Sequence, residues 1–176
     1  IPCSSWLDSL LGLFAFQRVP YISRVVEYGK KASLLGYKDK LLIATEHISN
    51  PQEFCNDISM LFCTPTILLQ SFYEVTLSNS NPILHTGRLY SMWKDWNGEH
   101  YKNNSLFYTS WTDEASDLLI KMDEEFFCLL DKLGVSTEHL PTLLQHYEVH
   151  DAKSLTQKIK RIPAFSNILS PMKQTP

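Results

Sequence analysis

The chain of 176 residues is 44% hydrophobic and 20% charged, which is typical of a globular protein with a core of ordinary size. Its formal net charge of −3 excludes a broad basic surface for nucleic acid or anionic lipid. Apolar runs such as 10–16 are far shorter than the roughly 20 residues of a membrane-spanning helix. We therefore expect neither nucleic acid nor a membrane as a partner.

The first half of the sequence predicts short buried strands and one helix. Segments 12–17 and 40–47 suit buried strands, and 28–31 and 35–40 look like a strand edge and a turn. Asn50 followed by Pro51 predicts a helix that continues to about Leu61, with Asn50 as its N-cap. The segment 66–78 is β-branched and apolar, and its periodicity fits either a strand or a buried helix.

After Pro82 the pattern becomes helical. Thr112 predicts the N-cap of a long amphipathic helix, which Gly134 ends. Two shorter helices follow, and Pro163 stops the second of them. The expected helices are 112–133, 139–147 and 151–161, and the tail 167–176 is expected to be irregular.

The predicted fold is therefore mostly α with a small β portion. The change of pattern near 77–82 divides the chain into a β-rich domain, residues 1–78, and a helical domain, residues 79–176.

The cysteine and histidine spacing does not favour a metal site. No Cys-x-x-Cys pair occurs, so we expect reduced thiols and, by default, a cytoplasmic protein. His146 and His150 have the i, i+4 spacing of a zinc pair, but the helix is expected to end between them. The sequence therefore predicts no metal. The cysteines are Cys3, Cys55, Cys63 and Cys128.

The strongest candidate for chemistry is the stretch 79–88, Asn-Ser-Asn-Pro-Ile-Leu-His-Thr-Gly-Arg. A turn-forming Asn, Ser and Pro cluster precedes His85, a residue type that gains or loses a proton near neutral pH. This pattern indicates either a catalytic histidine at the mouth of an element or a structural histidine beside a turn.

The stretch resembles the Asn-Pro-x-x-His motif of the octopine and nopaline dehydrogenases, the opine dehydrogenase family. Upstream, residues 14–21, 24, 27–31 and 35–36 look like the end of that family's dinucleotide domain. Downstream, residues 87–93 and the apolar run to 170–173 follow the order of its helical domain. The resemblance covers nearly the whole chain. It implies a helical substrate domain attached to the last strands of a Rossmann-like domain.

The resemblance also implies an activity. The family condenses an amino acid with an α-keto acid and reduces the imine with NADH or NADPH. The implied catalytic acid/base is His85, because an imidazole can hold or release a proton near neutral pH. Asn81 is the implied substrate-binding residue, and Gln17 resembles a residue on the cofactor side of the cleft. The expected partners are the two substrates, and a homodimer is compatible with the sequence.

Two departures from the family pattern qualify this expectation. The six glycines lie far apart, so the 176 residues hold no Gly-x-Gly-x-x-Gly phosphate cradle. The family's Arg-Tyr-x-Thr-Glu-Asp-like segment, whose Asp orients the catalytic His and whose Arg holds a substrate carboxylate, is also absent. We therefore expect a truncated chain that is inactive alone, from an active parent. The residues that choose between NAD and NADP would lie after the missing cradle.

Two other hypotheses remain open. One is a non-catalytic helical module that binds a protein or itself through an aromatic cluster. The other is a related dehydrogenase with a different substrate pair. The aromatic cluster consists of Trp93, Trp96, Tyr101, Phe107, Tyr108 and Trp111.

Overall fold

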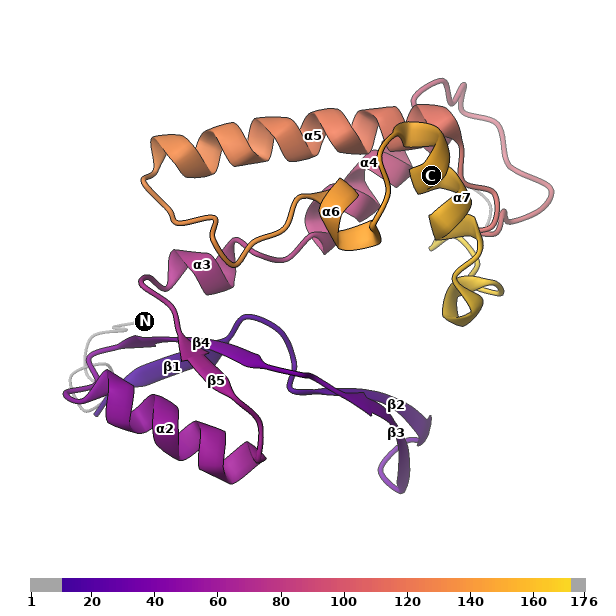
Figure 1. The fold of residues 1–176 in the computed structure, drawn as a ribbon. Coiled ribbons are helices and arrows are strands. Elements are labelled where there is room, and N and C mark those ends of the chain that lie inside the picture. The colour runs from indigo at the N-terminus through magenta and orange to yellow at the C-terminus, as the bar shows by residue number, and fades with distance from the viewer. Residues whose placement is uncertain (1–10, 172–176) are drawn as a thin grey trace, which may run out of the picture. The chain divides into compact units, whose positions relative to one another are not determined.

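The computed structural model describes residues 11–171, and the chain divides into two compact units between Asn79 and Ser80. In Figure 1 the first unit runs from indigo to magenta and the second from pink to yellow. Each unit is described by itself. The expectations for Cys3 and for residues 172–176 lie outside the described residues.

The first unit contains a three-stranded sheet in the order β1-β4-β5. Strand β1 is antiparallel to β4, whereas β5 is parallel to β4 and follows it through helix α2 (Figure 1). A parallel pair joined by a helix is the βαβ arrangement of dinucleotide-binding folds. The elements are β1 (Leu13–Phe16), β4 (Leu41–Glu46), α2 (Pro51–Phe62), β5 (Thr66–Leu68) and α3 (Tyr73–Thr76).

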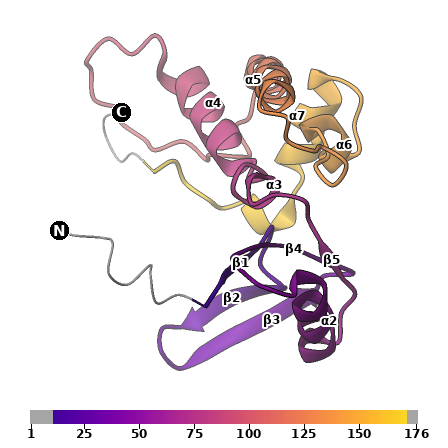
Figure 2. The same ribbon diagram turned by 90° about the vertical axis from the view of Figure 1, so that its left-hand side faces the viewer.

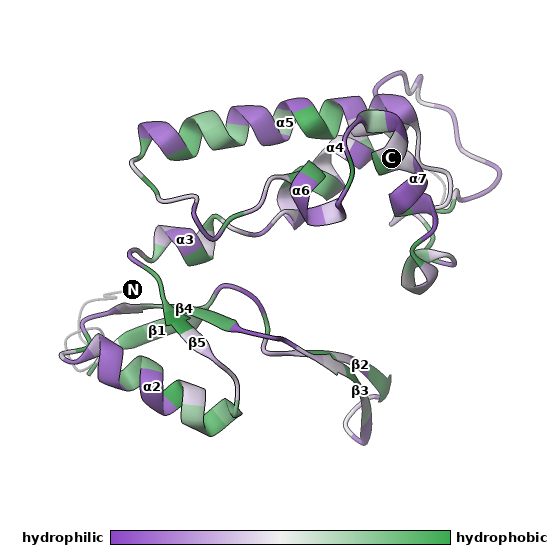
Figure 3. Ribbon diagram, in the orientation of Figure 1, coloured by the Kyte–Doolittle hydropathy of each residue, from purple (hydrophilic) through white to green (hydrophobic). Residues whose placement is uncertain are grey.

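Apolar residues of the sheet and of α2 form the core of this unit. Figure 3 shows β4 and β5 largely in the green of hydrophobic residues. Ile43 of β4 and Cys55 of α2 are fully buried in this core. Phe16 and Phe62 pack edge to face at 5.4 Å between ring centroids, which closes the core beside β1.

The predictions for this unit are mostly confirmed. Asn50 occupies the N-cap of α2, but its side chain makes no capping bond; its amide donates to the Glu53 carboxylate at 3.1 Å. The helix continues to Phe62, one residue beyond the predicted end, and Cys63 ends it in the left-handed conformation. The ambiguous segment 66–78 contains both alternatives, because strand β5 is followed by helix α3.

A β-hairpin forms a separate two-stranded sheet in the first unit. Strands β2 (Tyr21–Glu27) and β3 (Lys31–Tyr37) pair antiparallel around a turn at Gly29, whose φ is +72°. The sequence indicated a strand edge at 28–31 and a turn at 35–40, whereas the turn lies at 28–30 and residues 35–37 belong to β3. It missed the first strand, because Tyr21–Glu27 places apolar residues on both exposed faces and shows no alternation.

The second unit is helical. Helix α5 packs against both α4 and α7, which lie on either side of it (Figure 2). Its core contains the fully buried Trp111, Leu119 and Leu155. Helix α4 approaches α5 closely at Gly87, where a Cβ atom would lie 2.8 Å from Leu119 Cδ1. The elements are α4 (Asn81–Trp93), α5 (Asp113–Lys132), α6 (Leu143–Tyr147), α7 (Ala152–Lys160) and the 3-10 turn η1 (Pro163–Phe165).

Side-chain caps fix the ends of these helices. The Thr112 hydroxyl accepts a hydrogen bond from Ala115 N at 3.2 Å, which confirms the predicted start of α5. The predicted start of α6 at His139 is wrong, since the helix begins at Leu143. Thr142 and Gln145 cap each other's backbone there, a capping box that the sequence reading overlooked.

A buried carboxylate joins α5 to α6. Asp123 on α5 is 9% exposed, and its Oδ2 accepts a hydrogen bond from Leu143 N at 2.8 Å. This bond satisfies the first N–H group of α6. Burial raises the pKa of the Asp123 carboxyl, and the Leu143 N–H group offsets part of that rise.

This contact predicts a pH dependence of stability. Because the pKa of Asp123 is higher in the folded protein, the folded state binds the proton more readily than the unfolded state. The contribution of this carboxyl to stability therefore falls as the pH rises from its ordinary pKa through the raised pKa. Asp123→Asn removes this slope and keeps an acceptor for Leu143 N. Asp123→Ala leaves that N–H group unpaired and lowers the free energy of unfolding by about 2 kcal/mol. Urea unfolding between pH 4 and 8 measures the pH slope and the loss of stability. Equal stability of Asp123→Asn and Asp123→Ala at every pH would contradict the role of the Leu143–Asp123 hydrogen bond.

Candidate active site

His85 lies in the second turn of α4, on the face that carries Asn81 one turn earlier. The helix begins directly after Ser80, with Pro82 in its first turn, so the predicted bend before the histidine is the start of the helix itself. Residues four positions apart share one face of a helix. Both Asn81 and His85 are exposed. The histidine is therefore open to solvent and is not enclosed by apolar packing.

Two aromatic residues of one loop contact the His85 ring. The loop consists of residues 106–111 and leads into the N-cap of α5. The Phe107 ring lies 5.6 Å from the imidazole, centroid to centroid, and the Tyr108 hydroxyl lies 3.4 Å from Nε2. The imidazole is thus supported on one side by protein and open on another.

Tyr108 is itself held firmly. Its ring stacks on Phe165 at 4.4 Å and on Trp111 at 6.1 Å between centroids, and the residue is 8% exposed. Burial raises the pKa of the Tyr108 phenol, so the hydroxyl keeps its proton at neutral pH.

Arg88 ties the 106–111 loop to α4. Its Nε donates to Phe107 O at 2.9 Å, and its Nη2 donates to Ser110 O at 3.0 Å and to Ser110 Oγ at 2.8 Å. The guanidinium also lies 5.3 Å from the centre of the Trp111 ring. Burial lowers the pKa of Arg88 to about 10, which is still above neutral pH, so a 3% exposed cation holds this loop.

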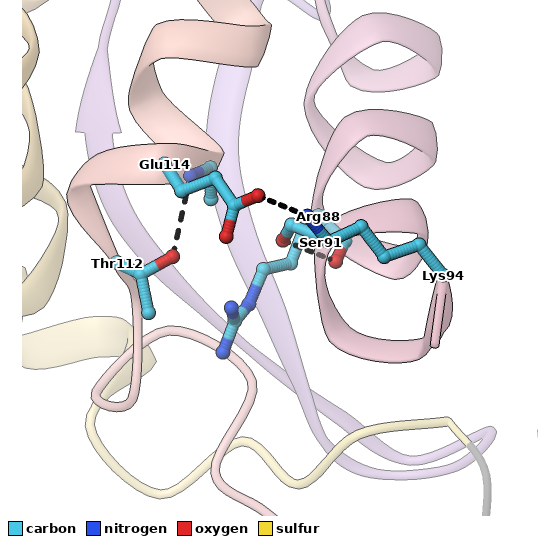
Figure 4. A network of polar contacts seen from close by, with 6 residues as sticks. Arg88, Ser91, Lys94, Thr112 and Glu114 are labelled. Atoms are coloured by element: carbon cyan, nitrogen blue, oxygen red, sulfur yellow. Dashed lines mark hydrogen bonds and ion pairs between the residues drawn. The ribbon is translucent and has the colours of Figure 1, made fainter. Parts of the chain in front are cut away.

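A second polar contact joins the far end of α4 to the start of α5. Figure 4 shows the Lys94 ammonium group paired with the Glu114 carboxylate, beside the Thr112 cap and Arg88. The bond and the charge of Glu114 raise the pKa of Lys94. Each charge also lies at the helix end whose dipole favours it. The two helices that flank the 106–111 loop are thereby linked at the surface.

Gln17, the predicted cofactor-side residue, lies in the first unit just after β1. It is half-buried; its side-chain amide donates to Glu74 O at 3.2 Å, and its backbone N–H group donates to Leu42 O at 2.8 Å. Part of its hydrogen-bonding capacity is therefore used to join β1 to α3. The structure brings Asn81 and His85 together on one helix and places Gln17 in the other unit.

The sequence reading missed Arg88 and Tyr108 as members of this site. Arg88 carries a usable signal, since it lies one turn along the helix from His85. Tyr108 was noted only within the aromatic cluster. In that cluster Phe107, Tyr108 and Trp111 are buried in the core, whereas Trp96 and Tyr101 are exposed.

The other sequence features give no support for a second functional site in the described residues. Helix α6 ends at Tyr147, before His150, with Glu148 left-handed at a φ of +55°. Among residues 11–171, no cluster of three or more His, Cys, Asp or Glu residues could hold a metal ion. The described cysteines, Cys55, Cys63 and Cys128, are free thiols. Between positions 11 and 171 no helix has the length and apolar character needed to cross a bilayer.

The chain belongs to the octopine/nopaline dehydrogenase family. Residues 68–175 match the family's alpha-helical domain, described as "NAD/NADP octopine/nopaline dehydrogenase, alpha-helical domain". An opine dehydrogenase of Haliotis discus hannai is 21% identical over 93% of this chain and 44% of its own length. The family membership and the fold class expected from the sequence are therefore confirmed.

Solved structures agree on the fold. Two octopine dehydrogenase structures, one with NADH and L-arginine and one with NADH and pyruvate, each match with a TM-score of 0.66. Their identities to this chain are 19% and 21%; the matches cover 92% of this chain and 43% and 42% of theirs. The chain thus spans less than half the length of the relatives that it matches.

The Arg88 contacts predict a large effect on stability. Arg88→Leu leaves Phe107 O and Ser110 O without their buried donor and lowers the free energy of unfolding by about 3 kcal/mol, measured by urea denaturation. The exposed Arg161→Leu is the matched control and changes stability by less than about 0.5 kcal/mol. Equal effects of the two variants would rule out a structural role for the Arg88 hydrogen bonds.

Proposed function

We propose that the complete protein is an NAD(P)-dependent opine dehydrogenase in which His85 is the catalytic acid/base. The observation that supports this most directly is an exposed imidazole near the start of α4, within the part of the chain that matches the family's helical domain, in contact with Phe107 and Tyr108. The proposed enzyme class is an oxidoreductase acting on CH–NH groups.

The reaction needs a group that both gives and takes a proton. Condensation of an amine with a ketone releases water, so the carbonyl oxygen must be protonated as it leaves. The reduced nicotinamide dinucleotide then supplies hydride to the imine carbon, giving a secondary amine. His85 as an imidazolium can donate the proton and can face the substrate carboxylates as a cation. In the reverse direction the neutral imidazole takes a proton back.

Asn81 is the proposed substrate-binding residue. It shares the exposed face of α4 with His85, and its amide offers both a donor and an acceptor. A carboxylate or carbonyl oxygen placed over His85 would lie within reach of this face.

The residues of the chain fit only part of a cofactor site. The β4-α2-β5 unit has the parallel crossover of a dinucleotide-binding domain, and we assign residues 1–78 to the end of such a domain and 79–176 to the helical substrate domain. No Gly-x-Gly-x-x-Gly occurs in the 176 residues, so these residues do not form the phosphate cradle. We propose Gln17 as a contributor to the cofactor side and expect no turnover from the 176 residues alone.

The proposed substrates are an amino acid and an α-keto acid. This assignment is supported by the matched octopine dehydrogenase structures, which contain L-arginine or pyruvate together with NADH. The competing hypothesis of an aromatic docking module is weakened, because Phe107, Tyr108 and Trp111 are in the core.

The proposal predicts a kinetic defect. In the complete protein, His85→Ala lowers kcat for the reductive condensation of pyruvate with L-amino acids by about 10²- to 10⁴-fold, because the proton donor is lost. The dissociation constant of NADH, measured by fluorescence titration, stays unchanged. The exposed His150→Ala is the matched control and retains wild-type kcat. Turnover of His85→Ala close to wild type would refute the role of His85.

A further inference from the structure

The connection between α4 and the 106–111 loop contains the only Asn-Gly pair of the 176 residues. This pair is Asn97-Gly98, and the residues around it, 94–103, are all exposed. In an Asn-Gly pair the side-chain amide carbon lies within reach of the following backbone nitrogen, and glycine has no Cβ atom to obstruct the approach. The pair therefore places an electrophilic carbon beside an unhindered nitrogen at the surface.

The backbone at Gly98 is open on every side. Its φ is +95°, a conformation that L side chains rarely adopt, and a Cβ atom built there would meet no atom within 4 Å. Within residues 11–171, the Gly98 N–H group donates no hydrogen bond. No bond of the described structure therefore has to break before this nitrogen turns toward the Asn97 side chain.

A hydrogen bond holds the Asn97 side chain over the same stretch of backbone. The Asn97 Oδ1 atom accepts a hydrogen bond from Glu99 N at 3.0 Å. This is an Asx turn, a ring of atoms that includes the Gly98 nitrogen and the Asn97 amide carbon. Attack on that carbon places negative charge on Oδ1. The Glu99 N–H group already points at this oxygen, so it stabilises the charge as it develops.

A second bond keeps the turn closed. Trp96 Nε1 donates to Glu99 O at 2.8 Å, so Glu99 is bonded through both its N–H group and its carbonyl group to the two residues before Gly98. The folded connection thereby keeps the reacting carbon and nitrogen close together, whereas an unfolded chain samples this arrangement only part of the time.

We propose that Asn97 is a site of spontaneous deamidation. The Gly98 nitrogen forms a bond to the Asn97 amide carbon, and the bond from that carbon to the side-chain nitrogen breaks. This nitrogen leaves as ammonia and takes the proton of the Gly98 N–H group. Water then opens the resulting succinimide at one of its two carbonyl carbons, which leaves either aspartate or isoaspartate at position 97. No oxidation or reduction is involved, and the site does not depend on the proposed dehydrogenase activity.

The isoaspartate product changes the chain between the helix of His85 and the loop that contacts this histidine. It adds one methylene group to the backbone, and it adds a carboxylate between Asp95 and Glu99 in the sequence. An isoaspartyl carboxylate on an exposed segment is the substrate class of a carboxyl methyltransferase that uses S-adenosylmethionine. The product therefore also defines a partner by its chemistry.

Mass spectrometry of the complete protein tests the proposal. The folded protein is incubated at neutral pH and digested with trypsin, which cleaves after Lys94 and Lys102 and releases residues 95–102 with Asn97 as their single asparagine. We expect this peptide to gain about one mass unit, the difference between an amide and a carboxylic acid. We also expect it to accept a labelled methyl group from S-adenosylmethionine in the presence of an isoaspartyl methyltransferase.

The neighbouring tryptic peptide is the internal control. Residues 103–121 carry the exposed Asn103, which is followed by Asn104 and not by a glycine. Because the side chain of Asn104 obstructs the attack, we expect this peptide to keep its mass over the same time.

Two variants separate the proposed chemistry from exposure alone. Asn97→Gln keeps an amide but lengthens the side chain by one methylene group, so a larger ring would have to form. Gly98→Ala keeps the Asn97 amide and adds the obstructing Cβ atom. We expect both variants to reduce the mass gain of residues 95–102 to the level of the control peptide. Asn103→Gln is the matched control and leaves the gain at Asn97 unchanged.

The rate in the folded protein tests the role of the turn. We expect residues 95–102 of the folded protein to gain mass at least as fast as the same synthetic peptide in solution, because the two bonds of Glu99 hold the reacting atoms together. No gain at Asn97 on prolonged incubation, or a gain confined to the synthetic peptide, would overturn the proposal. An equal gain in Gly98→Ala would assign the reaction to direct hydrolysis of an exposed amide and would also contradict it.

Discussion

The buried guanidinium of Arg88 is the contact on which the arrangement of the candidate site depends. It joins two backbone carbonyls and a hydroxyl of the 106–111 loop to α4, so a segment without regular structure is held by a charged fork with fixed geometry. Without these bonds the Phe107 carbonyl group would be unpaired inside the core. The loop in turn carries the two aromatic rings that support the imidazole of His85.

The rest of the helical unit reinforces this arrangement from outside. Caps at Thr112, Thr142 and Asp151 satisfy the first N–H groups of α5, α6 and α7, and the buried Asp123 adds a bond across two helices. The helices are therefore well defined at their starts, where short side chains accept hydrogen bonds. The candidate site lies on the first two turns of α4, whose N-cap residue Ser80 makes no side-chain capping bond.

Much of this could be predicted from the sequence, and the failures have physical causes. The Thr112 cap and Gly134 delimit α5 in the sequence because both act locally. The start of α6 was missed because the reading extended the helix back through Pro141 and overlooked Thr142 and Gln145. His85 was singled out by its neighbours in the chain. Its contact with Tyr108 joins residues 23 positions apart, and no local pattern encodes a contact of that kind.

Gly87, between Thr86 and Arg88, has a consequence for the direction of the imidazole. A Cβ atom at this position would lie 2.8 Å from Leu119 Cδ1 and 3.3 Å from Met122 Sδ, so a side chain there would require these two side chains of α5 to shift. His85 and Arg88 lie on the same helix, one facing solvent and the other the core. The close packing at Gly87 therefore helps to hold the helix turn that presents His85 to solvent and Arg88 to the core.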